Sequence, residues 1–216
     1  MTTTLMHAPL TCSLAARFVA AEGDVPLEIA FLNLATKELE RGGSLYDINP
    51  LGQVSVLQFE DGTTLTETST VLLYLQSLSE KTGFRRDPSD VDYFQMVRWI
   101  AFCATELHKQ IFRVVFYNEA TDDVKDRVRD LAPQRFELLD RHLADREFLV
   151  GDSFSAADAY LSWFFVLSRN ARLDESGYSN LVAYRDRMLA RPKIAELIES
   201  DRLKDRELDQ RIIPGV

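Results

Sequence analysis

The chain has 216 residues, of which 46% are apolar and 27% charged, and its formal net charge is −9. This length suffices for one large domain or two small ones with a packed core, and the acidic balance argues against general binding to nucleic acids or anionic membranes. Only two cysteines occur, MTTTLMHAPL does not resemble a signal peptide, and no apolar run is long enough to span a bilayer. We therefore expect a cytosolic protein with reduced thiols.

The first elements alternate between strand and helix. A short strand is predicted over 3–7, and the spacing of apolar residues over 12–23 predicts an amphipathic helix that stops at Gly23. Residues 25–34 read as a second strand, because Pro26 is incompatible with a helix interior.

A hairpin and a helix follow. Residues 35–52 are rich in glycine, asparagine and proline and are predicted to be mostly loop. Two β-rich runs, 54–60 and 63–67, flank Asp61-Gly62, which is a strong hairpin signal. A helix over 68–81 completes the order β-α-β, loop, β-β-α, which is typical of a small mixed sheet with helices packed on it.

Helical periodicity dominates the rest of the chain. We predict domains at 1–81 and 91–216, joined by a polar linker at 82–90. Helices are expected over 90–119, 122–146, 155–170, 178–190 and 192–200.

Three details of this half can be tested. Pro133 should bend the second of these helices, and Pro192 suits the first turn of the last. The helix over 155–170 is apolar nearly all round and should be buried, whereas the charged residues 201–216 are expected on the surface.

Two positions at the start of the first helix could carry chemistry. Cys12 follows Thr11 at the point where free N–H groups and the helix dipole favour an anion, so its thiol should be shifted toward thiolate. The alternative is a half-buried cysteine that serves as a small apolar residue. The Ser13 hydroxyl is a second candidate, because it could donate to a thiolate there.

Glu67 and Thr68 lie where a strand meets a helix. Thr68 could simply cap that helix. Alternatively, the free N–H groups of the helix hold a carboxylate or phosphate while Glu67 faces an ammonium group. The pair would then suit the head group of an amino acid.

Other candidates are weaker. His108 lies in the middle of ATELHKQIF beside Lys109, where a lone histidine is more often packed or exposed than functional. The spacing of the other histidines and of the two cysteines gives no reason to expect a metal site. Ser155 and Asp158 in SFSAADAY form a capping-box pattern, to which we assign a structural role.

Taken together, these segments resemble the cytosolic glutathione transferases, and the bacterial beta class in particular. The resemblance spans nearly the whole chain and rests on TCSLAARF, INPLGQVSVL, DGTTLTETSTVLLYL, ATELHK and GDSFSAADAYL, in that order. It implies a thioredoxin-like α/β N-terminal domain, an all-α C-terminal domain and a homodimer. It also implies an enzyme that uses glutathione as co-substrate, without a metal, on a small apolar electrophile.

The resemblance implies roles for individual residues. Val54, with Gln53 beside it, would offer main-chain hydrogen bonds to the cysteinyl part of glutathione, while Glu67 and Thr68 hold its γ-glutamyl ammonium and carboxylate. Cys12 would lie beside the glutathione sulfur and could form a mixed disulfide with it. His108 and Lys109 match the family's His-Lys pair close to the thiol, so His108 joins Cys12 and Ser13 in the expected catalytic group. Thr11, Lys37 and Lys109 are expected to bind glutathione.

The chain departs from the family pattern at several places. Ser55 replaces a proline that follows a cis peptide bond, and a cis bond is less costly before proline than before other residues. Either the surrounding loop enforces a cis Val54–Ser55 bond or the bond is trans and the glutathione edge is reshaped. We expect cis, because Val54 must present both its N–H and its C=O. Ala101 and Glu38 replace an asparagine and a basic residue.

These departures leave two alternatives to a transferase that acts on an electrophile or a disulfide. One is a glutathione-binding or regulatory protein without efficient catalysis. The other is a glutathione-dependent isomerase or dehalogenase, since a fold does not determine its chemistry.

Overall fold

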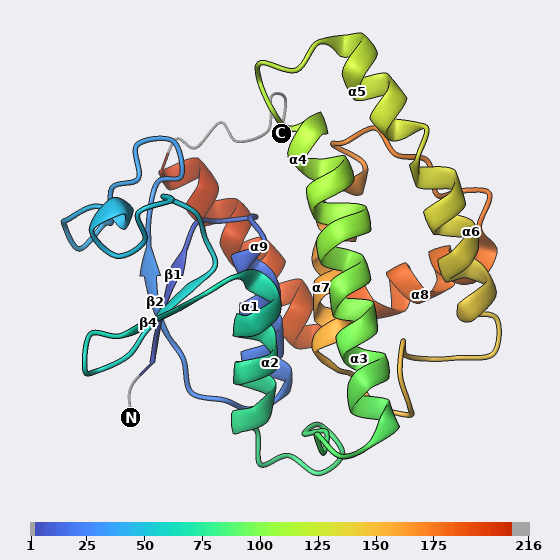
Figure 1. Ribbon diagram of the computed structural model, residues 1–216, viewed down its shortest axis with the longest axis horizontal. Coiled ribbons are helices and arrows are strands. Elements are labelled where there is room, and N and C mark those ends of the chain that lie inside the picture. The colour runs from blue at the N-terminus through green and yellow to red at the C-terminus, as the bar shows by residue number, and fades with distance from the viewer. Residues whose placement is uncertain (1–2, 209–216) are drawn as a thin grey trace.

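The computed structural model describes residues 3–208 and shows a small sheet beside a larger bundle of helices (Figure 1). The strand order is β2-β1-β3-β4, with β1 parallel to β2 and the other two pairs antiparallel. The expected mixed sheet is therefore confirmed, although its strands are shorter than predicted. They are β1 (Thr4–His7), β2 (Glu28–Phe31), β3 (Val56–Gln58) and β4 (Thr64–Thr66).

The alternation of side chains along β1 and β3 divides the core between the two faces of the sheet. Leu5 and Leu57 join the main cluster with the helices α1 (Ser13–Glu22) and α2 (Thr68–Leu78). Met6 and Val56 point the other way, into a smaller cluster under the loop that holds the short 3-10 helix Leu45–Asp47. In Figure 1, α1 and α2 lie between the sheet and α3.

The predicted hairpin between β3 and β4 is confirmed. Phe59 N–H donates to the Thr63 carbonyl at 2.9 Å, and the Asp61 carboxylate accepts from the Thr63 N–H. Gly62 has φ +83°, a conformation that side chains disfavour.

The helix predicted over 90–119 is one continuous segment with a change of pitch inside it. It comprises α3 (Val91–Phe102), a π-helix (Cys103–Phe112) and α4 (Arg113–Val115), so it ends earlier than predicted. Arg113 N–H donates to the carbonyl of His108, five residues back, as the wider π pitch requires. π-helical turns are frequent at functional sites, and this one carries the ATELHK motif.

The prediction of one bent helix over 122–146 is wrong. The structure has two helices, α5 (Asp122–Arg129) and α6 (Ala132–His142), separated at 130–131. Pro133 lies in the first turn of α6. Backbone N–H groups in a first turn have no carbonyl partner within the helix, so the lack of an N–H in proline costs no hydrogen bond there. The proline therefore starts a helix instead of bending one.

The capping box at the start of α7 (Ala156–Ser168) is confirmed. Asp158 accepts hydrogen bonds from the N–H and hydroxyl of Ser155, and also from the Leu149 N–H and the Tyr184 hydroxyl. Twelve of the thirteen residues of α7 are buried, as predicted. This helix is the centre of the bundle, and the box joins its start to two neighbouring segments.

The chain then forms α8 (Ser179–Leu189) and α9 (Pro192–Glu207), and Pro192 lies in the first turn of α9 as predicted. The expectation of a surface segment from 201 onward is wrong for Asp201, which is fully buried because α9 packs against α1. Residues 209–216 lie outside the described part of the chain. Over 3–208, no helix has the length and apolarity needed to cross a bilayer.

Candidate active site

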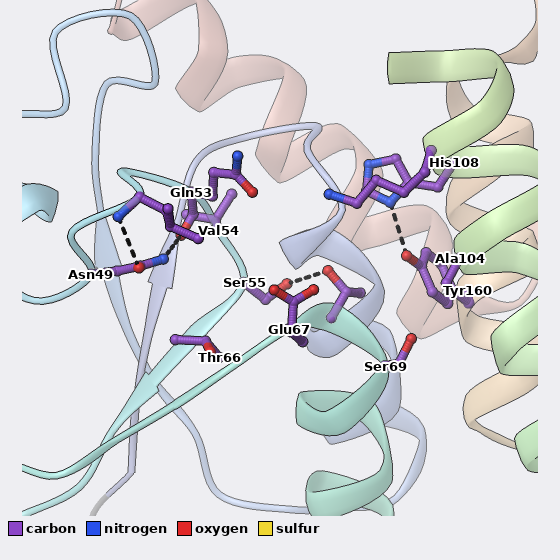
Figure 2. Close-up of a pocket in the computed structure, with 13 residues that line it drawn as sticks. Asn49, Gln53, Val54, Ser55, Thr66, Glu67, Ser69, Ala104, His108 and Tyr160 are labelled. Atoms are coloured by element: carbon purple, nitrogen blue, oxygen red, sulfur yellow. Dashed lines mark hydrogen bonds between the residues drawn. The ribbon is translucent and has the colours of Figure 1, made fainter. Parts of the chain in front are cut away.

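Two adjoining cavities lie between the sheet and the helices that carry ATELHK and SFSAADAY, and Figure 2 shows the residues that line the first of them. The first, here called the polar cleft, is bounded by 49–55 and 66–69 on one side and by Ala104, His108, Lys109 and Tyr160 on the other. The second, here called the apolar cavity, has a volume of about 260 Å³. The two share Gln53, Val54, His108 and Lys109, so a ligand could extend from one into the other.

The Val54–Ser55 peptide bond is cis, as expected from the sequence. The Val54 carbonyl accepts a hydrogen bond from the Cys12 thiol at 3.3 Å, and its N–H has no partner among the residues that the structure describes. Asn49 stabilises this loop, because its side-chain amide donates to the Gln53 carbonyl at 2.8 Å. A half-buried stretch of backbone is therefore open to a peptide-like ligand.

Cys12 precedes the first residue of α1, as predicted, and its side chain lines the apolar cavity. The expected shift toward thiolate is wrong, because burial raises the pKa of the Cys12 thiol. Hydrogen bonds from Thr68 and Ser55 and the charge of Lys109 oppose that rise. The rise in the pKa of Cys12 that desolvation causes therefore outweighs the lowering expected from its position at the start of α1.

Ser13 is not in the cleft. Its hydroxyl is fully buried and hydrogen-bonded to Nδ1 of His7 at 2.7 Å and to the Thr11 hydroxyl at 2.8 Å. It lines neither cavity. The expectation that Ser13 donates to a thiolate in the site is therefore not met by the geometry, because the side chain points toward β1.

A buried polar network behind α1 was not anticipated. Asp201 of α9 accepts hydrogen bonds from Nε2 of His7 at 3.0 Å and from the Leu10 N–H at 2.7 Å, and it pairs with Arg17. Burial lowers the pKa of His7 more than the Asp201 carboxylate raises it. Through Leu10 and Ser13, this network holds the backbone on both sides of Cys12.

The start of α2 presents a carboxylate and open N–H groups to the polar cleft. Glu67 precedes the helix with φ +67° and makes no side-chain cap. Thr68 is the first helical residue, so the interpretation of Thr68 as the cap is wrong. Its hydroxyl lies 3.3 Å from that of Ser55. Figure 2 shows Glu67 and Ser69 facing the cleft, where the first-turn N–H groups lack intrahelical acceptors.

His108 faces the cleft from the π-helix. Its Nδ1 lies 2.8 Å from the Tyr160 hydroxyl (Figure 2), and its ring packs edge-on against Trp163. Burial lowers the pKa of His108 to about 3, and the charges of Lys109 and Arg113 add to the effect. Burial also raises the pKa of Tyr160 well above its usual value. At neutral pH the site therefore holds a neutral imidazole bonded to a protonated phenol.

Most of the residues selected from the sequence converge here. The cavities are lined by Thr11, Cys12, Lys37, Gln53, Val54, Glu67, Thr68, His108 and Lys109. Aromatic residues of the 160–170 helix were also expected from the sequence to line the site, and Tyr160 and Trp163 do so. Asn49 and Ser69 were not anticipated, although Asn49 lies in the NP turn. Glu38 and Ala101 are exposed and line neither cavity.

Comparisons with known proteins agree with this geometry. Residues 105–201 match the family described as glutathione S-transferase, C-terminal domain. Glutathione S-transferase GstA of Escherichia coli O157:H7 is 28% identical over 93% of this chain and 99% of its own length.

Solved structures extend the likeness to the whole fold. A glutathione transferase from Methylococcus capsulatus is 30% identical, with a TM-score of 0.88 over 94% of this chain and 100% of that one. A bacterial beta class glutathione S-transferase from Sphingomonas chungbukensis is 28% identical, with a TM-score of 0.85 over 92% of this chain and 98% of that one. The chain therefore belongs to the glutathione transferase family of enzymes and resembles its bacterial beta class.

Proposed function

We propose that this glutathione transferase binds glutathione along the half-buried backbone of Val54 and joins the glutathione sulfur to an electrophile in the apolar cavity. One observation carries the proposal. Together the two cavities present a carboxylate and a helix start at Glu67 and Thr68, a peptide edge beside a thiol, and the ammonium groups of two lysines. These groups complement the charged ends and the peptide backbone of the tripeptide.

The γ-glutamyl end suits the start of α2. The carboxylate of Glu67 faces the cleft and can accept from the ammonium group, while the N–H groups of Thr68 and Ser69 favour the α-carboxylate. The hydroxyl groups of Thr68 and Ser69 can add hydrogen bonds. No acidic residue lies in the first turn of α2, so nothing there competes for these donors.

The cysteinyl and glycyl parts extend from there. Val54 can pair its N–H and C=O with the cysteinyl backbone, as strands pair in a sheet. The carbonyl would then exchange the Cys12 thiol for the ligand N–H. The ligand sulfur would lie near Cys12 and His108, and the glycyl carboxylate near Lys37 and Lys109, which line the adjoining cavity.

The protein's chemical contribution is to favour the thiolate of bound glutathione. The start of α1, the positive charge of Lys109 and the hydrogen-bonding groups of the cleft all stabilise an anion there. The neutral His108 can accept or donate one hydrogen bond, with Tyr160 holding its other nitrogen. The thiolate then attacks an electrophile against Leu10, Phe112 and Phe116.

We further propose domain limits of 1–81 and 91–216 with a linker at 82–90, a homodimer, a cytoplasmic location and a role in detoxification. Val91 and Phe94 on α3 are 66% and 61% exposed, and Leu138 on α6 is 47% exposed. Such exposed apolar side chains on α3 and α6 suit contact with a second copy.

The proposal is tested by retention on immobilised glutathione, followed by an assay with glutathione and an aryl halide such as 1-chloro-2,4-dinitrobenzene. We expect retention, elution by free glutathione, and formation of the thioether above the uncatalysed rate. Retention without turnover would instead support a binding protein. A failure of glutathione to bind would contradict the proposed site.

A second activity is favoured by the thiol of Cys12 beside Val54. Once deprotonated, Cys12 can attack glutathione disulfide, so that a protein–glutathione disulfide forms and one glutathione thiolate leaves. Because the raised pKa of Cys12 disfavours the thiolate, this reaction should be slow at neutral pH and accelerate as pH rises.

Replacement of Cys12 by alanine should abolish this adduct. After incubation with glutathione disulfide, intact mass spectrometry should show one glutathione on the wild type and none on Cys12→Ala. Cys103→Ala is the control, because Cys103 is buried in the π-helix and its variant should retain the adduct. An adduct of one glutathione on Cys12→Ala would contradict the assignment.

A further inference from the structure

The apolar cavity is positively charged although the protein as a whole is acidic. Lys37, Lys109 and Arg113 line it, and no aspartate or glutamate does, in a chain of net charge −9. None of the three forms an ion pair with another residue in the described range 3–208. Burial and the nearby charge of Arg113 lower the pKa of Lys37. Three cations therefore face one space without a carboxylate to balance them.

The remaining walls of the cavity are aromatic and aliphatic. Phe112 packs edge-on against Phe116 and Trp163, with ring centroids 5.2 and 5.6 Å apart. Leu10, Leu34 and Leu167 complete this surface. Such a surface suits a flat or hydrophobic body.

Arg113 lies at the edge of this surface. It is the first residue of α4, follows the π-helix directly and is exposed. Its guanidinium lies 5.4 Å from the centroid of the Tyr117 ring. The carboxylate of Glu119 accepts from the Tyr117 hydroxyl at 2.6 Å and forms no ion pair with Arg113. The guanidinium is thus held over a ring with its donors available to a ligand.

Glutathione does not account for all three cations. In the proposed pose its γ-glutamyl carboxylate lies at the start of α2, in the polar cleft. Only the glycyl carboxylate then reaches the apolar cavity, which Lys37 and Lys109 line together with Gln53 and Val54. Among the described residues Arg113 contacts the Tyr117 ring but has no carboxylate partner. A guanidinium pairs with a planar carboxylate through two parallel hydrogen bonds.

We propose that the second substrate of this enzyme is an acid: an electrophile whose aromatic or hydrophobic body packs on Phe112, Phe116 and Trp163 and whose carboxylate or sulfonate pairs with Arg113. This inference rests on the proposed function. Arg113 is then a specificity-determining residue, since it contacts the substrate away from the reacting atoms. An uncharged electrophile of the same shape would still bind the aromatic wall.

A matched pair of electrophiles tests this assignment: 4-chloro-3,5-dinitrobenzoate and its methyl ester. In both reactions the glutathione sulfur forms a bond to the ring carbon, chloride leaves with the electron pair of the C–Cl bond, and the thiol proton passes to solvent. Each kcat/KM is divided by the uncatalysed rate constant with the same electrophile. The quotient then corrects for the different reactivity of acid and ester.

The wild type should prefer the acid by this corrected measure. Arg113→Gln should lower kcat/KM for the acid about tenfold, the effect of one charge-assisted hydrogen bond at a partly solvated site, and leave the ester and the KM for glutathione within about twofold. Arg127→Gln on α5 is the matched control. It removes one exposed positive charge outside the cavity and should change none of these values.

Equal losses for acid and ester in Arg113→Gln, or a raised KM for glutathione, would overturn the assignment, because Arg113 would then serve glutathione or the fold. The binding of glutathione and of the two product conjugates, measured by calorimetry, distinguishes a failure of the acid-substrate inference from a failure of the proposed function. If glutathione binds but the acid conjugate binds no more tightly than its ester, only the acid-substrate inference fails. If glutathione itself does not bind, the proposed function fails and the inference fails with it.

Discussion

Replacement of Asp201 by asparagine is expected to lower the free energy of unfolding by about 3 kcal/mol, because it breaks a buried ion pair and leaves a cation without its partner. Asp201 is fully buried, and its two oxygens bind Arg17, His7 and the Leu10 N–H. Asparagine retains the shape but presents an NH₂ group where one of those oxygens accepts. Urea denaturation followed by circular dichroism measures the loss.

The control for this variant lies on the same helix. Glu199→Gln removes an exposed ion pair with Arg202 and should change stability by less than about 0.5 kcal/mol. If Asp201→Asn were as stable as this control, the buried network would not contribute to the free energy of unfolding. Because Leu10 and Ser13 flank Cys12, the folded Asp201→Asn protein should also form the glutathione adduct more slowly, which a purely global loss of stability does not require.

Replacement of Glu67 by glutamine is expected to weaken glutathione binding by about tenfold to a hundredfold, which is the range for loss of a hydrogen-bonded ion pair. Glutamine keeps the length of the side chain and one carbonyl oxygen, but it cannot compensate the ligand ammonium. Glu67 makes no side-chain cap of α2, so the free energy of unfolding should stay within about 0.5 kcal/mol of the wild-type value. Isothermal titration calorimetry and urea denaturation measure the two quantities.

Glu80→Gln is the control for the loss of one negative charge. Glu80 is exposed beyond the end of α2 and lies outside both cavities, so glutathione should bind this variant as it binds the wild type. A parallel loss of binding and stability in Glu67→Gln would indicate a structural role alone. Unchanged affinity would contradict the assignment of Glu67 to the ligand ammonium.

The features that the sequence predicted correctly have local causes. The Asp61-Gly62 turn, the Ser155 capping box and the burial of the helix over 155–170 each follow from residues within a few positions of one another. The convergence of Cys12, Val54, Glu67 and His108 on one groove followed from the family resemblance instead. Spacing alone did not predict which of these segments would meet.

The errors arise where distant residues decide the outcome. Asp201 and His7 are 194 positions apart, so no local pattern indicates that Asp201 is buried against His7. The same holds for the pKa of Cys12, which is raised by burial against segments distant in the sequence. The position of Cys12 at a helix start does not indicate that burial. Pro133 is a different case, because a proline can either bend a helix or start one, and only tertiary packing decides.

A crystal structure of the protein grown in excess glutathione tests the glutathione site most directly. The proposed function predicts electron density for the tripeptide along Val54, its ammonium on Glu67, its α-carboxylate at the first turn of α2 and its sulfur between Cys12 and His108. A groove that remains empty, or glutathione bound with its sulfur away from Cys12 and His108, would contradict the binding mode on which the proposed chemistry depends.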